Sequence, residues 1–282
     1  MKRLVPLSNT PSYVERYLRI RDSKSADVRV ELESIHRPIV RQYDSYALQA
    51  ASRNLEVVRR SQRCATSANA LRHCYDSPTN ALRALKKEIK ELQPRRQLKY
   101  CPMCGVTLPK TFDHYMPAAR FPEYAVMALN LIPCCSQCNS IKDDDWLSTS
   151  GERQFLHLYF DCIPEEQYLF VQLLSSADMR GVGASFELRR PSGFRRNKWS
   201  LLTSHYKRLK LLERFSEEGN EEIAEVLAGC KAHLQAGGGS ASLLLQNLAN
   251  DRATVYGDSH WRTVLMRALS TYSRLDQLIP LI

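Results

Sequence analysis

The sequence predicts an α+β protein that is mostly helical, with a small cysteine-tied module in the middle and a short β-hairpin after it. Three observations lead to this fold class. Apolar residues recur at helical spacing over much of the 282-residue chain. Two Cys-x-x-Cys pairs begin at Cys101 and Cys135, and two short alternating runs flank Gly181-Val182-Gly183.

Residues 1–98 are expected to form a basic helical region. A short helix is predicted from Tyr13 to Ile20, whereas residues 27–32 fit a strand or a helix because apolar residues alternate there. From Ile39 to Leu55 the apolar positions follow helical spacing. Ser77 and Pro78 are predicted to start another helix, which ends before Pro94. Its apolar face would consist of Leu82, Leu85, Ile89 and Leu92.

Residues 148–282 are expected to form a mostly helical region that contains the β-hairpin. The hairpin strands are predicted over 167–173 and 184–188. Helices are predicted over 200–216, 221–236, 241–250 and 259–272, with a flexible break at residues 237–240. Core positions on the last helix would be Trp261, Leu265 and Leu269. The histidines expected to be structural are His157, His205 and His260.

The charge distribution bears on the partners of this protein. The chain has a formal net charge of +10. Residues 1–99 hold 21 Lys and Arg against 10 Asp and Glu, whereas residues 100–282 hold 19 against 20. A basic region of this kind favours binding to a nucleic-acid backbone. A solvated helix surface and a contact with an acidic partner protein stay open as alternatives.

Cysteine usage and hydropathy bear on the compartment. Four of the nine cysteines form the two pairs, and the others show no pairing pattern: Cys64, Cys74, Cys134, Cys162 and Cys230. Reduced thiols in a cytoplasmic protein are therefore expected. The N-terminal residues lack the apolar run of a signal peptide, and no stretch is long enough to span a bilayer, so no membrane association is expected.

The stretch from 99 to 147 carries the most informative motifs. Each Cys-x-x-Cys pair can give two thiolates to one tetrahedral zinc. A structural Zn²⁺ is therefore predicted on Cys101, Cys104, Cys135 and Cys138. Cys134 could replace Cys135 as a ligand, although the two-residue spacing favours Cys135. Between the pairs lie Asp113-His114-Tyr115-Met116-Pro117 and Asn130; Asn139 and Lys142 follow the second pair.

This order of motifs resembles the HNH endonucleases, whose nuclease core is a hairpin and one helix around a catalytic metal, the ββα-metal fold. The matching signature is Cys-x-x-Cys, Asp-His-x-x-Pro, Asn and Cys-x-x-Cys-Asn-x-x-Lys. Asn139 stands where the family name has its last His, as in many members. The resemblance implies a zinc-stabilised HNH module over 99–147 and a metal-dependent endonuclease that hydrolyses phosphodiester bonds of DNA, with RNA as an alternative.

The resemblance implies a catalytic set of His114, Asn130 and Asn139. His114 titrates near neutrality when unperturbed, so it can accept a proton from water. Asp113 and Asn139 offer the hard oxygens that a catalytic Mg²⁺ or Mn²⁺ prefers. In the family, the Asn at the place of Asn130 holds the His-bearing loop by hydrogen bonds. Lys142 lies one helical turn after Asn139, where it either reaches a phosphate or is a solvated helix residue.

Basic side chains outside the signature are candidates for nucleic-acid contacts. A first group leads into the first cysteine pair: Lys86, Lys87, Lys90, Arg95 and Arg96. A second group, with Arg195 and Arg196, is interleaved with aromatic residues, a combination that suits single-stranded or distorted nucleic acid. The alternative in both places is an ordinary solvated surface. Residues 143–145, three consecutive Asp, are also expected to be solvated.

Two other interpretations follow from the same residues. The four cysteines could belong to a zinc ribbon that binds nucleic acid and cuts nothing. The phrase Asn-Leu-Ile-Pro-Cys-Cys between helical regions is also similar to HNH subunits of Septu-type bacterial anti-phage systems. Those subunits work beside an ATPase, so that resemblance implies an ATPase partner subunit and a role in antiviral defence.

Overall fold

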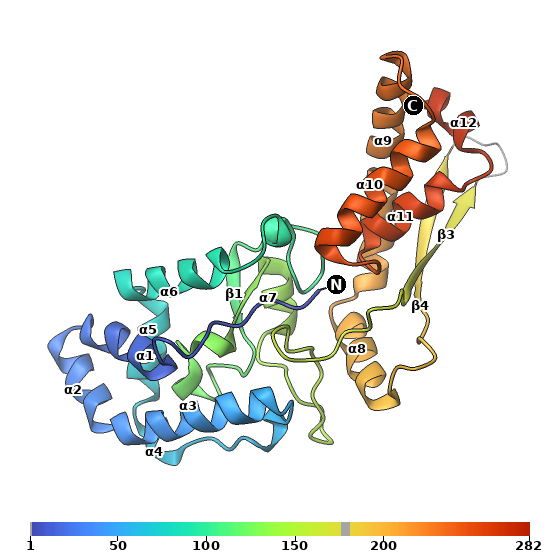
Figure 1. Ribbon diagram of the computed structural model, residues 1–282. Helices are drawn as coiled ribbons and strands as arrows, with labels where there is room; N and C mark the ends of the chain where they lie inside the picture. The colour runs from blue at the N-terminus through green and yellow to red at the C-terminus, as the bar shows by residue number, and fades with distance from the viewer. Residues whose placement is uncertain (1, 176–180) are drawn as a thin grey trace. The chain divides into compact units, whose positions relative to one another are not determined.

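The computed structural model describes residues 2–175 and 181–282 (Figure 1). Within these residues the chain is mainly helical and has two small antiparallel sheets, β1-β2 and β3-β4. The predicted α+β class is confirmed. No helix in the described part of the chain is both long and apolar enough to cross a lipid bilayer.

Two compact units divide the chain. One contains residues 3–103 and 107–161, and the other contains residues 162–282 together with 1–2 and 104–106. The basic helical region and most of the cysteine-bearing stretch share one unit.

The N-terminal region consists of six helices. Their bounds are α1 Tyr13–Asp22, α2 Ala26–Ser34, α3 His36–Ala51, α4 Gln62–Thr66, α5 Ala68–Asp76 and α6 Asn80–Glu91. Ser12 caps α1 in a capping box with Glu15, which satisfies free amides at the helix start. The core between the helices includes Tyr17, Tyr43 and Tyr46, all essentially inaccessible to solvent.

Three details of this region differ from the sequence expectations. The strand alternative for residues 27–32 is wrong, since these residues belong to α2. Helix α6 is capped by Thr79, whose hydroxyl accepts from the Leu82 amide at 3.4 Å, and not by Ser77. The Ser77 carbonyl instead accepts from the ammonium of Lys24. Leu92, the C-cap residue of α6, is 41% exposed and does not belong to the buried face of the helix.

The central segment folds as two strands and a helix. Strand β1 (Thr111–His114) pairs antiparallel with β2 (Leu131–Cys134), and α7 (Ser136–Lys142) follows directly. The register opposes Asp113 to Ile132 and His114 to Leu131. Helix α7 packs against β1. The intervening residues 115–130 contain two short 3₁₀ turns, Pro122–Tyr124 and Ala128–Asn130.

The C-terminal region contains the predicted hairpin and five helices. Strands β3 (Leu169–Ser175) and β4 (Val182–Leu188) pair antiparallel. Strand β3 lies two residues later than predicted, and β4 begins two residues earlier, so that residues 182 and 183 belong to a strand and not to the turn. Residues 176–180 lie outside the description. The helices are α8 Arg196–Arg208, α9 Leu211–Gln235, α10 Ala241–Tyr256, α11 Trp261–Ser270 and α12 Leu275–Leu278. The expected core residues of α11, Trp261, Leu265 and Leu269, are buried.

The predicted helix break between residues 216 and 221 is wrong, because α9 runs through it. Gly219 in this helix faces β4, and a Cβ there would approach the side chains of Ala184 and Phe186 to 3.2 and 3.3 Å. The glycine therefore allows close helix–sheet packing and does not end the helix. Phe215, one turn earlier, stacks on Trp261 with ring centroids 5.8 Å apart.

Candidate functional site

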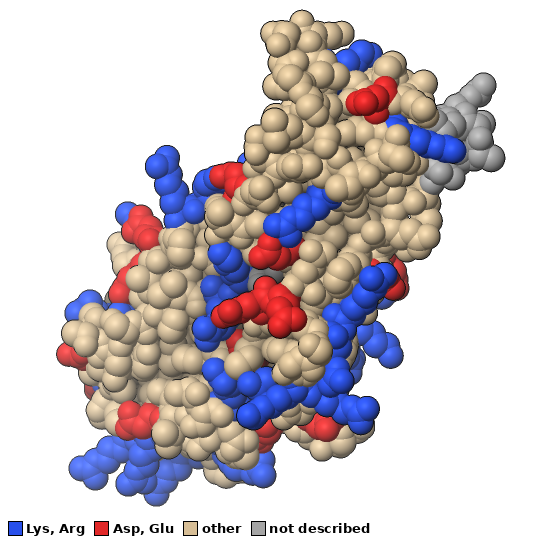
Figure 2. Space-filling view, turned by 45° about the vertical axis from the view of Figure 1, so that its right-hand side comes forward, with Lys and Arg blue, Asp and Glu red and all other residues tan. Residues whose placement is uncertain are grey.

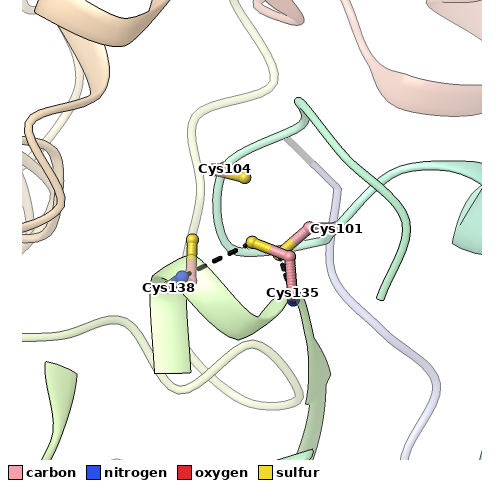
Figure 3. Close-up of side chains that lie close together, drawn as sticks. All are labelled: Cys101, Cys104, Cys135 and Cys138. Atoms are coloured by element: carbon pink, nitrogen blue, oxygen red, sulfur yellow. Dashed lines mark hydrogen bonds between the residues drawn. The ribbon is translucent and has the colours of Figure 1, made fainter. Parts of the chain in front are cut away.

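The structure brings the four paired cysteines together (Figure 3). Their sulfur atoms all lie within 4.8 Å of one another, and all four side chains are buried. Four thiolates bound to one zinc at about 2.3 Å would lie roughly 3.8 Å apart. The cluster therefore fits a four-cysteine zinc site with only a small contraction, and it could hold a structural zinc ion.

Backbone amides orient the thiols of this cluster. The Cys135 amide donates to the sulfur of Cys101 at 3.3 Å, and the Cys138 amide donates to the sulfur of Cys135 at 3.4 Å. Cys135 is also the N-cap of α7, so its thiol lies at the positive end of the helix. Both contacts favour thiolates at the sulfurs.

Cys134, the alternative ligand, lies outside the cluster. It is on β2, where its sulfur lies 3.3 Å from the Thr111 hydroxyl. Burial raises the pKa of this thiol to about 12, with the Thr111 contact opposing the increase. Cys134 therefore behaves as a buried neutral side chain, which agrees with the preference for Cys135.

Arg214 is a cluster neighbour that sequence reasoning missed. Its guanidinium donates to the sulfur of Cys104 at 3.5 Å, and its side chain is buried in α9. A zinc ion with four thiolates carries two net negative charges, so a buried cation at this distance offsets part of them. No local motif distinguishes Arg214 from the other arginines of the chain.

His114 ends strand β1, and its ring has a defined tautomer. Nε2 lies 2.8 Å from the carbonyl oxygen of Ala125. A carbonyl oxygen only accepts, so Nε2 carries the proton and the lone pair is on Nδ1. Burial lowers the pKa of His114 to about 4; the Ala125 carbonyl opposes this, and Lys142 and Lys86 add to it. The ring is neutral at pH 7 and can accept a proton at Nδ1.

Asp113 forms a buried ion pair with Lys142. Lys142 Nζ lies 3.1 Å from Asp113 Oδ1 and donates to the backbone carbonyl of His114 at 2.8 Å. Burial raises the pKa of Asp113, and Lys142 opposes the increase. The expectation that Lys142 is solvated or reaches a phosphate is wrong, because its side chain is only 1% exposed. Lys142 instead fixes the end of β1 to α7.

Asn130 is completely buried and uses both ends of its amide. Its Nδ2 donates to the carbonyls of Met116 and Tyr124 at 3.0 and 3.1 Å. Its Oδ1 accepts from the Met116 amide at 2.7 Å and from the Tyr46 hydroxyl at 3.0 Å. Asn130 thus closes the loop that follows His114, and Tyr46 ties this loop to α3. A residue at this depth positions others and does not touch a substrate.

Asn139 is on α7, one turn before Lys142, and its side chain is half-buried. It shares with Asp113 the oxygen donors that Mg²⁺ and Mn²⁺ prefer, and the two residues lie on elements that pack together. A divalent cation on Asp113 would share this carboxylate with Lys142. Asp113 is only 3% exposed, and its carboxylate already has a cationic partner. Asp143 and Asp144 are exposed, as expected.

The predicted basic residues separate into different places. Lys86, Lys87 and Lys90 line one groove beside β1. Arg95 and Arg96 are exposed beyond the end of α6 and do not line it. Arg195 and Arg196, at the start of α8, belong to the other compact unit. On the face drawn in Figure 2, Lys and Arg side chains gather in several groups, with Asp and Glu between some of them.

Comparisons with known proteins support a limited relationship. No family model matches the chain. Protein ea31 of Escherichia phage lambda is 30% identical to it over 131 residues, which cover 45% of this chain and 43% of that protein. No solved structure matches. The chain thus spans less than half the length of this curated relative.

Proposed function

We propose that this protein is a metal-dependent endonuclease of the HNH type, acting on DNA, with RNA as the alternative substrate. The observation that carries the proposal is the state of His114. Its Nε2–H is committed to the Ala125 carbonyl, and its neutral Nδ1 is left to accept a proton. His114 is the last residue of β1 in the segment β1-β2-α7. Two of the clustered cysteines precede β1, and the other two lie at the start of α7.

In the proposed reaction, His114 Nδ1 takes a proton from the attacking water. Asp113 and Asn139 would hold Mg²⁺ or Mn²⁺, which stabilises the charge of the scissile phosphate and the leaving oxygen when bound. Lys142 orients Asp113 through Oδ1 and holds the His114 carbonyl. Asn130 and Tyr46 keep the loop after His114 in place. The cysteine cluster with zinc would fasten the ends of the segment.

The test is a comparison of His114→Ala with His73→Ala. His73 is an exposed histidine of α5 in the same compact unit, so it controls for the loss of an imidazole. Purified proteins are incubated with plasmid, single-stranded DNA and tRNA in the presence of Mg²⁺ or Mn²⁺. His114→Ala should lower cleavage by about 10²–10⁴-fold, the usual contribution of an acid–base group, while zinc content and circular dichroism stay unchanged.

Two outcomes would contradict this proposal. Cleavage by His114→Ala within a few-fold of the parent would remove His114 from the mechanism. A folded, zinc-containing parent that binds nucleic acid and cleaves none of the three substrates would favour the non-catalytic zinc ribbon.

A further inference from the structure

A basic groove lies between α6 and β1. It has a volume of about 710 Å³, and its base contains Tyr75 of α5 and Phe112 of β1. Five cationic side chains line it: Arg83, Lys86, Lys87, Lys90 and Lys110. The acidic residue in its lining is Glu91, whose carboxylate lies 3.7 Å from Lys87. The lining therefore has four more cations than anions, and its complement is a polyanion.

The four cations of α6 form a stripe along the helix. Arg83, Lys86, Lys87 and Lys90 are spaced at i, i+3, i+4 and i+7, which places them on one face. Over seven residues this face extends about 10 Å. A nucleic-acid strand carries one phosphate per roughly 3.4 Å of helix axis, so about three phosphates match the stripe.

The aromatic rings of the groove are already covered by these lysines. Lys86 Nζ lies 3.7 Å from the ring centroid of Tyr75 and 5.6 Å from that of Phe112. Lys90 Nζ lies 5.2 Å from the Phe112 centroid. Nucleic-acid binding surfaces that read single strands use open rings on which bases stack. Here the rings hold cations, which leaves phosphates as the groups that the groove can contact.

The ammonium groups of Lys86 and Lys90 lie near the same ring, that of Phe112, and their charges repel each other. Lys86 is half-buried. Burial lowers its pKa and Lys90 lowers it further, with Asp76 opposing. An anion in the groove would offset the repulsion between these two charges.

His114 is in contact with Tyr75, a residue of the groove lining. The Tyr75 ring packs edge-on against the His114 ring with centroids 4.3 Å apart. The Tyr75 hydroxyl donates to the Phe112 carbonyl at 3.1 Å, which ties α5 to β1 two residues before His114. A strand in the groove would therefore continue past the residue proposed to activate water.

We infer that the groove of α6 and β1 binds the sugar–phosphate backbone of one nucleic-acid strand and delivers it to His114 without reading its bases. The delivery to His114 rests on the proposed nuclease function, because it has a purpose only if His114 takes part in cleavage. The binding itself does not require cleavage. It adds Arg83 and Lys110 to the contact surface and gives Tyr75 and Phe112 the role of supporting lysines.

The experiment measures binding in the His114→Ala chain, so that cleavage does not interfere. Fluorescence anisotropy follows labelled dA, dT and dC homopolymers and a mixed duplex over a range of salt concentrations. Lys86→Met and Lys110→Met are compared with Lys207→Met, an exposed lysine of α8 in the other compact unit. Lys86→Met keeps most of the side-chain length and removes the charge.

Each groove variant should weaken binding to all oligonucleotides by a similar factor and reduce the slope of log affinity against log salt by about 1. Lys207→Met should change neither quantity. The melting temperature of free Lys86→Met should not fall below that of the parent, which separates a binding role from a structural one. A more than tenfold preference among the homopolymers, or unchanged affinity in both groove variants, would overturn the inference.

The two proposals fail in different ways. If the parent binds as expected but cleaves nothing, the groove stands and the nuclease function falls. If the parent cleaves and both groove variants of the His114→Ala chain bind as that chain itself does, the nuclease function stands and the groove assignment falls.

Discussion

The cysteine end and the histidine end of the strand–strand–helix segment differ in what holds their residues. At the cysteine end, four identical ligands converge on one point, and the amides that orient them come from Cys135 and Cys138 themselves. At the histidine end, the contacts come from different parts of the fold: the Ala125 carbonyl accepts from the His114 ring, and Lys142 contacts the Asp113 carboxylate and the His114 carbonyl. One end is a repeated local motif, and the other is a set of separate tertiary contacts.

This difference has a consequence for mutation. Removing one ligand of a shared centre should disable the whole centre, because metal binding and folding are coupled there. Removing one contact at the histidine end should affect mainly the residue that it holds. The four predictions below test this contrast, from the largest expected effect to the smallest.

The largest effect is expected from Cys135→Ser, with Cys134→Ala as its neighbour control. Cys135→Ser removes a ligand and the thiol that caps α7, so the zinc should be lost and the module should fail to fold. Cys134→Ala should keep about one zinc per chain, as a single four-cysteine site requires. Elemental analysis measures the zinc content of both variants, and thermal melting shows whether each variant is folded. A folded, zinc-free parent would contradict the prediction outright.

Lys142→Met should give the next largest effect. It leaves the Asp113 carboxylate buried without its cation, which typically costs about 3–5 kcal/mol. The double variant Lys142→Met with Asp113→Asn should recover a large part of this loss, because the uncompensated charge is gone. Chemical denaturation measures the free energy of unfolding of the single and the double variant. Equal stability of the single and double variants would show that the ion pair does not hold the end of β1.

The free energy of unfolding should decrease in acid because of His157. Burial lowers the pKa of this histidine to about 3, whereas the unfolded value is near 6.5. The unfolded chain therefore binds the proton first, so the contribution is complete above pH 6.5 and is lost as pH falls. For this one group the loss reaches about 2 kcal/mol at pH 5. Between pH 7 and pH 5, the free energy of unfolding from denaturation curves should decrease by about 2 kcal/mol more in the parent than in His157→Gln.

The smallest effect is expected from Tyr46→Phe. It removes the hydroxyl that donates to Asn130 Oδ1 and lies 3.2 Å from His157 Nε2, and keeps the ring. A cost of about 1–3 kcal/mol is typical when buried partners are left unsatisfied. Tyr13→Phe is the matched control, because the Tyr13 hydroxyl donates to the Leu7 carbonyl away from the site. If cleavage is measured, Tyr46→Phe should reduce it more than the control does.

Sequence patterns predicted the helical character and the β3-β4 hairpin, whereas the β1-β2 hairpin was expected from the resemblance to the HNH endonucleases. The predicted helix over 200–216 is wrong in its bounds, because α8 ends at Arg208 and α9 begins at Leu211. Apolar periodicity was sufficient for α1 and α11, where a buried face recurs with each turn. It failed at Gly219, because a glycine that ends a helix and one that admits a neighbouring strand look the same in a sequence. It also could not choose between strand and helix for α2, a short segment with one buried residue.

By itself, the sequence determined the α+β class, the two cysteine pairs and the order of the residues between them. These features depend on the spacing of residues along the chain, and this spacing can be read from the sequence. Only the tertiary structure decided that Lys142 is buried against Asp113, that His114 carries its proton on Nε2, and that Lys86 lies over Tyr75 and Phe112. A lysine or histidine has the same letter in water and in a protein interior, and its charge state and partner depend on which side chains the fold places around it.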